Sequence, residues 1–284
     1  MIQPSFRIIP RLDIKGNELV KGINLDGLRA LGKPEFFAKS YYVAGADEIF
    51  FQDVTASLYD ENTLHDLISS IAKQIFIPLT VGGGIRNLED IRLLLKSGAD
   101  KVSINTAGVK NPSFISEAVK NFGSSTITIS IETIKQLNGQ YLIFTDAGRE
   151  TTGIELFNWI KKIQKLGAGE IIITLVDFEG TAKGFDLELI KKLKDSCKVP
   201  LIIHGGAGKK NDILELAKFK HIDGVCIGSI FHYEITKKYK KVPTLNFGNT
   251  EYLKNNSHNE SFKTISVNVL KDYLKKKKIN VRTK

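Results

Sequence analysis

The sequence contains an internal repeat with a spacing of 122 to 123 residues. Three pairs of segments match at this spacing. They are residues 45–57 with 167–181, 76–91 with 198–213, and 100–106 with 223–229. Chance similarity would not keep one offset through several separate segments, so we infer that the chain is built from a duplicated unit.

Short apolar runs alternate with helical segments along the chain. Eight runs have the length and the β-branched composition of buried strands. They are residues 7–13, 47–53, 77–84, 100–105, 126–132, 169–177, 199–206 and 223–229. Segments between them, such as 63–75, 87–98 and 155–167, carry apolar residues at helical spacing. Strands joined by crossover helices predict a parallel sheet, and eight such units predict an α/β fold, a closed (β/α)₈ TIM barrel.

The repeat and the strands together predict the domain organisation. One barrel is expected over residues 1–284, with twofold half-barrels at about 5–122 and 123–233. An extra segment at 234–266 is expected to precede a C-terminal helix and basic tail at 267–284.

Composition limits the classes of partner. The chain has 284 residues and a formal net charge of +10, but seven basic residues and one acid lie in Lys271–Lys284. The rest of the chain is therefore only mildly basic. It contains no aromatic-rich basic motif of the kind that would indicate a nucleic-acid partner. No run reaches the length of a membrane span, and the charged N-terminus does not resemble a signal peptide. We expect a cytoplasmic protein without a metal, a cofactor or a membrane partner.

Two acids stand at matching positions of the halves. The first predicted strand of one half ends at Asp13, in "IIPRLDIKG". The first predicted strand of the other half ends at Glu132, in "ITISIETIK". In a (β/α)₈ barrel the active site lies at the carboxyl ends of the strands, so these acids should face each other across its mouth. Opposed carboxylates suit general acid and base catalysis. The alternative is that each acid caps a loop or forms an ion pair.

Glycine-rich strand ends suggest a second kind of site. "VGGGI" with "SINT" in one half, and "HGGAG" with "IGSIF" in the other, place backbone amides where phosphate oxygens can bind. A ligand with a phosphate at each end is implied. The alternative is that these glycines form tight turns only.

Charged residues suggest two further features. Lys21 is expected in a loop after the first strand, where it could contact substrate or remain solvated. Charges of balanced sign lie near the starts of four strands, at the opposite end of the barrel. They are Arg7, Glu48, Lys101 and Glu170. Their ordinary interpretation is a structural ring of ion pairs.

Several motifs resemble one enzyme family. "RIIPRLDIKGNELVKGIN", "PLTVGGGIRN", "GADKVSINTA", "LGAGEI", "GTAKGFDLELI", "GGAGK", "SIFH" and "INVR" resemble the cyclase subunit of imidazole glycerol phosphate synthase, from histidine biosynthesis. This resemblance implies a twofold-symmetric barrel that receives ammonia from a glutaminase subunit and forms a heterodimer with it. It also implies a lyase that converts a bisphosphorylated formimino-ribulosyl ribonucleotide to imidazole glycerol phosphate and aminoimidazole carboxamide ribonucleotide.

The resemblance also implies roles for single residues. Asp13 matches a catalytic acid or base, and Lys21 matches a lysine that contacts substrate. One phosphate site is matched by Gly84, Asn105 and Thr106, and the other by Gly180, Gly206, Gly228 and Ser229. The ammonia gate is matched by Arg7, Glu48, Lys101 and Glu170, and an interface acid by Asp100.

The departures from the family pattern concentrate at the mouth. Glu132 stands where the family has aspartate, and Phe178 and Glu179 stand in an Asp-Arg-Asp-Gly-Thr run. His204 replaces a small residue, and Arg11 stands where a cysteine is usual. "TDAGRE" replaces a small polar loop after the fifth predicted strand.

These departures leave alternatives to the cyclase open. One is a paralogue that passes ammonia to a nucleotide-sugar amidation enzyme in surface-polysaccharide synthesis. Others are the single-chain isomerase of the same pathway, which would not need the gate, and a scaffold without catalytic activity.

Overall fold

A closed ring of eight parallel strands forms the centre of the computed structural model, which describes residues 4–54, 64–239 and 261–283. In ring order the strands are β1 (Arg7–Lys15), β4 (Ile49–Asp53), β5 (Leu79–Gly82), β6 (Lys101–Ile104), β7 (Ile127–Lys135), β10 (Glu170–Leu175), β11 (Leu201–His204) and β12 (Gly224–Ile227). Each strand pairs in parallel with the next, and β12 pairs with β1. This closure confirms the predicted (β/α)₈ barrel.

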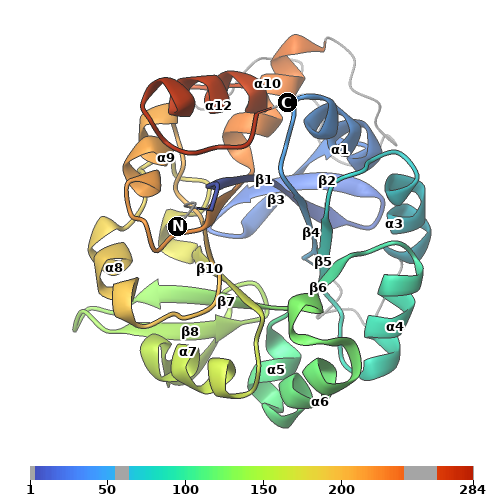
Figure 1. Ribbon diagram of the computed structural model, residues 1–284, viewed down its shortest axis with the longest axis vertical. Helices are drawn as coiled ribbons and strands as arrows, with labels where there is room; N and C mark the ends of the chain where they lie inside the picture. Colours follow the sequence, from blue (N-terminus) through green and yellow to red (C-terminus); the bar gives the residue numbers. More distant parts are fainter. Residues whose placement is uncertain (1–3, 55–63, 240–260, 284) are drawn as a thin grey trace.

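Helices surround the strands as an outer layer (Figure 1). Their bounds are α1 (Pro34–Val43), α3 (Leu64–Ala72), α4 (Leu88–Lys96), α5 (Thr106–Lys110), α6 (Ser113–Phe122), α7 (Leu156–Lys165), α8 (Leu187–Lys192), α9 (Lys210–Ala217), α10 (Ser229–Lys238) and α12 (Val267–Lys276). In the described part of the chain, short 3₁₀ turns occur at Ser124–Thr126, Val176–Phe178 and Leu193–Asp195. Local sequence sets several of the helix starts. At α4, for example, the Asn87 side chain accepts from the amides of Glu89 and Asp90.

Two antiparallel hairpins extend β1 and β7, at equivalent places in the two halves. β2 (Glu18–Ile23) pairs with β1 and with β3 (Asp26–Gly32). In the other half, β8 (Tyr141–Thr145) pairs with β7 and with β9 (Glu150–Glu155). Loops were predicted after both strands, and these predictions were wrong. The turn at Asn24 and Leu25 has positive φ at both residues without a glycine, so the usual hairpin signal is missing.

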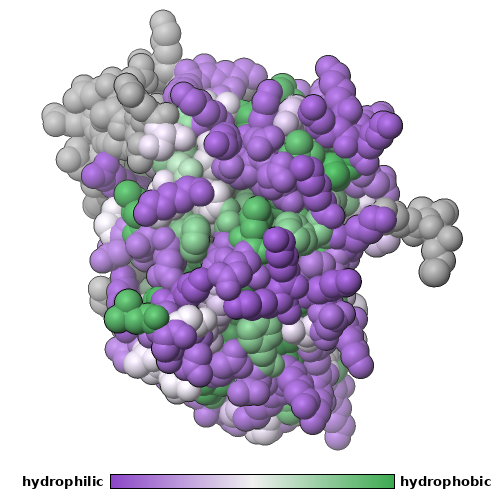
Figure 2. Space-filling model, turned by 90° about the vertical axis from the view of Figure 1, so that its left-hand side faces the viewer, coloured by the Kyte–Doolittle hydropathy of each residue, from purple (hydrophilic) through white to green (hydrophobic). Residues whose placement is uncertain are grey.

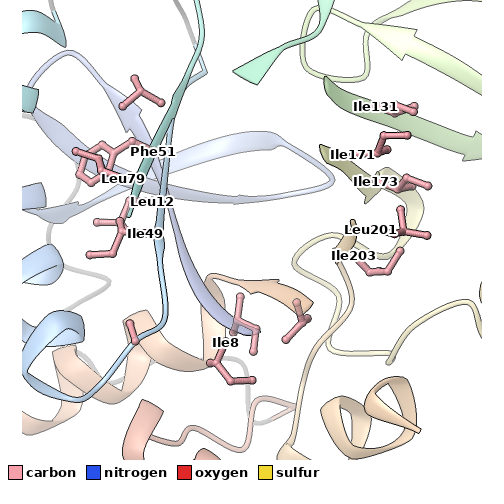
Figure 3. Close-up of a cluster of buried hydrophobic side chains, with 14 of the residues drawn as sticks. Ile8, Leu12, Ile49, Phe51, Leu79, Ile131, Ile171, Ile173, Leu201 and Ile203 are labelled. Atoms are coloured by element: carbon pink, nitrogen blue, oxygen red, sulfur yellow. The ribbon is translucent and has the colours of Figure 1, made fainter. Parts of the chain in front are cut away.

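Alternation along the strands separates two layers of side chains. One face of each strand packs under the helices, as Ile8 and Leu12 of β1 and Ile171 and Ile173 of β10 do (Figure 3). The opposite face points into the barrel. There a small apolar cluster fills the middle of the interior, and it consists of Ile9, Phe50, Ile172, Ile202 and Cys226.

The C-terminal helix α12 is attached to the barrel by a buried ion pair. Lys271 Nζ lies 2.6 Å from Asp47 Oδ1 and donates to the Gly45 carbonyl at 2.6 Å. Asp47 Oδ2 in turn accepts the Ile8 amide of β1 at 2.8 Å. The contact therefore joins the last helix to the first barrel strand.

The extra segment differs from its expected bounds. Residues 234–238 continue α10, while residues 240–260 of that segment lie outside the described residues.

The face that includes α8 and α9 is mostly hydrophilic, with small separate apolar spots (Figure 2). Among the helices in the described part of the chain, none has the length and apolar character needed to cross a bilayer.

Replacing Lys271 by methionine should lower the free energy of unfolding by roughly 3–5 kcal/mol, because Asp47 would remain buried without its cation. Urea denaturation measures the change. The matched control is Lys275→Met on the exposed side of α12, which should change stability by less than about 0.5 kcal/mol. Equal effects of the two variants would show that the buried pair does not anchor the helix.

Candidate active site

Asp13 and Glu132 lie on opposite sides of the barrel. Asp13 is on β1 and Glu132 on β7, and each strand is the fourth neighbour of the other in either direction around the ring. Both occupy the carboxyl halves of their strands, which form the mouth of such a barrel. The pairing order thus places the two predicted acids at opposed positions.

Asp13 is held by a cation from its own strand. Its side chain is buried, and Arg11 Nε donates to Asp13 Oδ1 at 2.8 Å. The two residues are two positions apart, so both side chains face the barrel interior. Asp13 is therefore an ion-paired carboxylate in this structure.

Glu132 has a different environment. Its side chain is half-buried, and Oε2 accepts the Gly148 amide at 2.8 Å. Removal from water raises the pKa of Glu132 to about 7, although the Gly148 amide and the Arg11 charge act in the opposite direction. At neutral pH this carboxyl group can both donate and accept a proton.

A cavity of about 400 Å³ opens beside Glu132. Gly84 after β5, Asn105 after β6 and Thr106 at the start of α5 all line it, as the first predicted phosphate site requires. Lys110, one turn after Thr106 on α5, lines it as well. The cavity thus brings a carboxyl group, a cation and backbone amides together.

The second predicted phosphate site is much narrower. Gly180, Gly206, Gly228 and Ser229 line a space of about 20 Å³ at the ends of β10, β11 and β12. Gly206 has a φ of 112°, and a Cβ there would collide with the Gly184 carbonyl. Glycine is therefore needed at Gly206 for this backbone to pass so closely.

Lys21 lies on β2 and is buried, so its assignment to a loop was wrong. Its ammonium group forms an ion pair with Glu179 and donates to the Gly22 carbonyl at 2.9 Å. Glu179 also accepts the Leu25 amide at 3.0 Å. We call the two predicted phosphate sites the first cradle and the second cradle. These contacts hold the β2–β3 hairpin against the segment that carries the second cradle.

Two buried histidines stand beside the second cradle. His204 lines its cavity, and burial together with the Arg11 charge holds the pKa of His204 well below its usual range. Burial also lowers the pKa of His232 to about 3, and its Nδ1 lies 2.6 Å from the Tyr41 hydroxyl. Both rings are neutral at physiological pH.

The four charged residues at the other end of the barrel form a closed ring of ion pairs. Arg7 lies 3.1 Å from Glu48 and 2.6 Å from Glu170, while Lys101 lies 2.7 Å and 2.8 Å from the same two acids. Burial alone would raise the pKa of Glu170, but Lys101 and Arg7 outweigh it and hold that pKa below its ordinary value. The structure thus brings together all four residues predicted for this end.

Asp100 stands just before β6 at the same end of the barrel. Its Oδ2 accepts the Leu79 amide at 2.8 Å, and its side chain remains exposed. Asp223 repeats this contact in the other half, where it accepts the Leu201 amide at 2.9 Å. Asp100 therefore has a local structural contact and remains accessible to a partner.

Several features of the mouth were not found from the sequence. Gly148, Thr174 and Lys110 contact the site from a turn, a strand and a helix. Lys110 follows Thr106 by four residues, so its position on the same helix face could have been inferred. Gly148 could not, because the turn between β8 and β9 has positive φ at the non-glycine residues Asp146 and Ala147.

Comparison with known proteins supports a family assignment. The family model described as "Histidine biosynthesis protein" matches residues 7–237. The chain belongs to this family. It is 49% identical over 205 residues to the "Imidazole glycerol phosphate synthase subunit HisF" of Legionella pneumophila, covering 72% of this chain and 97% of that protein. It is 43% identical over 227 residues to the protein of the same name from Alkaliphilus metalliredigens (strain QYMF), covering 80% and 90%.

Groups of three or more histidine, cysteine or acidic residues that could hold a metal ion are not found among the described residues. The chemical groups gathered at the mouth are carboxylates, cations, neutral imidazoles and backbone amides.

The raised pKa of Glu132 has a measurable consequence for stability. Between its ordinary value of 4.5 and about 7, the folded state keeps a proton that the unfolded state has lost. The wild type should therefore lose stability relative to Glu132→Gln as pH rises through this window, and the difference should stay constant above it. Urea denaturation at about pH 5 and about pH 8 measures the effect.

The matched control is Glu150→Gln, which removes an exposed acid from β9. The free energy of unfolding of this variant should match that of the wild type at both pH values. A Glu132→Gln variant with the same pH dependence as the wild type would mean that Glu132 ionises as it does in water.

Proposed function

We propose that this chain is the cyclase subunit of imidazole glycerol phosphate synthase, a lyase of histidine biosynthesis. The observation that carries the proposal is the pair of opposed acids at a mouth that also carries two glycine-rich cradles, in a chain that matches HisF proteins. The substrate would be the bisphosphorylated formimino-ribulosyl ribonucleotide, with one phosphate in each cradle. Ammonia supplies the nitrogen that completes the imidazole ring.

The two acids would divide the proton transfers of cyclisation. Asp13, paired with Arg11, is suited to accept a proton as a carboxylate. Glu132 has a pKa near 7 and is suited to give a proton to a leaving group and to take one back. The products would be imidazole glycerol phosphate and aminoimidazole carboxamide ribonucleotide.

The cradles would orient the substrate between these acids. Asn105 and Thr106 precede and begin α5, while Gly228 and Ser229 precede and begin α10. Backbone amides at such positions can donate to phosphate oxygens. Gly84 serves the first cradle, and Gly180 and Gly206 serve the second. Lys21 would exchange its contact with Glu179 for one with substrate when the ligand enters.

The ring of Arg7, Glu48, Lys101 and Glu170 would be the entry for ammonia. Above the ring, Ser103 and Ser130 on β6 and β7 face the interior opposite the larger side chains of the apolar cluster. Ser103 also lines the cavity beside Glu132. A passage along these small residues would lead from the ring of ion pairs to Glu132.

A glutaminase subunit would dock at the end of the barrel that carries this ring, with Asp100 as one interface acid. The resulting heterodimer would be a cytoplasmic enzyme. Neither HisF relative carries a name connected with nucleotide-sugar amidation, and we do not propose that alternative.

The test is turnover of the formimino-ribulosyl substrate with ammonium salts as the nitrogen source, which requires no glutaminase. The wild type should form imidazole glycerol phosphate. Asp13→Asn should lower kcat by about 10² or more with KM near the wild-type value, because the proton acceptor is lost. Glu132→Gln should abolish turnover, and Glu132→Asp should retain it.

Glu150→Gln serves as the control and should keep wild-type turnover. Absence of product with the wild type, while the substrate still binds, would reject the cyclase proposal. Wild-type turnover in Glu132→Gln would show that Glu132 takes no part in proton transfer.

A further inference from the structure

Arg11 is a buried cation at the centre of the mouth, in a position where the resembled family usually has cysteine. Its side chain is 3% exposed and lies above the ring of Phe50, with its guanidinium carbon 5.4 Å from the ring centroid. Nε donates to Asp13 at 2.8 Å, and Nη1 lies 3.2 Å from both Thr174 Oγ1 and His204 Nδ1. Arg11 therefore connects β1 with β10 and β11 across the barrel interior.

The layer of interior side chains to which Arg11 belongs determines which groups can balance its charge. On β1, Arg7 belongs to the ring of ion pairs, Ile9 to the apolar cluster, and Arg11 and Asp13 to the mouth. The apolar cluster separates Arg11 from the ion pairs of the ring. Its charge is therefore balanced at the mouth, and its direct acidic partner there is Asp13.

The contact with His204 also fixes a tautomer. A guanidinium group can only donate hydrogen bonds, so Nδ1 of His204 must be the acceptor. The Thr174 hydroxyl lies 3.3 Å from the same nitrogen and accepts a second hydrogen bond from Arg11 Nη1. The ring proton then lies on Nε2, and His204 presents a donor beside the second cradle, whose cavity it lines.

We infer that Arg11 is a positioning residue of the cyclase reaction, which holds Asp13 as an oriented carboxylate and fixes the donor nitrogen of His204. This inference rests on the function proposed above and extends it to a side chain that the family pattern does not predict. Arg11 acts through Asp13 and His204, and contact with the reacting atoms is not required of it.

The geometry favours this role over a purely structural one. A buried ion pair can often be replaced by apolar side chains without loss of stability, so the fold alone does not require a guanidinium group here. A fork of donors that reaches a carboxylate on β1 and an imidazole on β11 is instead what orientation of both groups requires.

Other ionisable groups also act on this part of the mouth and must be considered in any pH profile. They are Lys21 on β2, Glu132 on β7, Asp146 after β8, Glu179 after β10, Cys226 on β12 and His232 on α10. Variants at Arg11 leave all six side chains in place. A change confined to these variants can therefore be assigned to the guanidinium group.

The test compares Arg11→Gln with Arg11→Lys. Both replacements are shorter donors, but lysine keeps the charge and glutamine removes it. With ammonium salts, Arg11→Gln should lower kcat by about 10²-fold with a smaller change in KM, because the carboxylate is displaced. The acid limb of its pH–rate profile should move to higher pH, because the Arg11 charge acts to lower the pKa of Glu132 and its loss raises that pKa.

Arg11→Lys should keep the acid limb near its wild-type position and recover part of the rate. Identical acid limbs for the wild type, Arg11→Lys and Arg11→Gln would overturn the inference. If Arg11→Gln does not fold, Arg11→Cys replaces it as the neutral variant and is held to the same criterion.

A second measurement separates this inference from the proposed function. If the wild type makes no product, the proposed function fails, and thermal denaturation of four proteins then tests the Arg11 contact. Arg11→Gln should lower Tm by about 5 °C or more when Asp13 is present, and by much less in Asp13→Asn. The same loss in both backgrounds would overturn the inference.

Discussion

Pairing of β12 with β1 closes the barrel, and this closure fixes where the side chains of the mouth can lie. Because β12 pairs with β1, each of the eight barrel strands has a parallel neighbour on both sides, and β1 and β7 become opposite members of the ring. Alternation along each strand then fixes which residues face inward. On β1 this places Arg7 in the ring of ion pairs, Ile9 in the apolar cluster and Asp13 at the mouth. A shift of register by one residue would turn all of them outward.

The two halves share a backbone plan but differ in their side chains. Each half has a hairpin after its first strand, a glycine-rich end and a cradle at the start of a helix. At the mouth, however, Asp13 is tied to a cation, while Glu132 accepts a single backbone amide and has a pKa near 7. Two acids in different environments can take different parts in one reaction. The asymmetry in environment therefore matters more for the chemistry than the symmetry of position.

Much of this arrangement could be predicted from the sequence, because it follows from the internal repeat, the spacing of the apolar runs and the order of the strands. The repeat and the eight apolar runs predicted the barrel, and strand order then placed Asp13 opposite Glu132. The hairpins were missed, since their turns use positive φ at residues such as Asn24 and Asp146. The burial of Lys21 against Glu179 depends on one of these hairpins, so it could not be predicted either.

The contacts of Arg11 show a different limit. Its inward position follows from the strand pattern, but its partners on β10 and β11 lie more than 160 residues away and depend on the closed barrel. The proposed function requires one ligand to span both cradles between Asp13 and Glu132. The most direct measurement is a crystal structure of Asp13→Asn with the bisphosphorylated substrate bound. We expect one phosphate at Asn105 and Thr106 and the other at Gly228 and Ser229. A substrate with a single phosphate held in the mouth and the other in solvent would contradict the account.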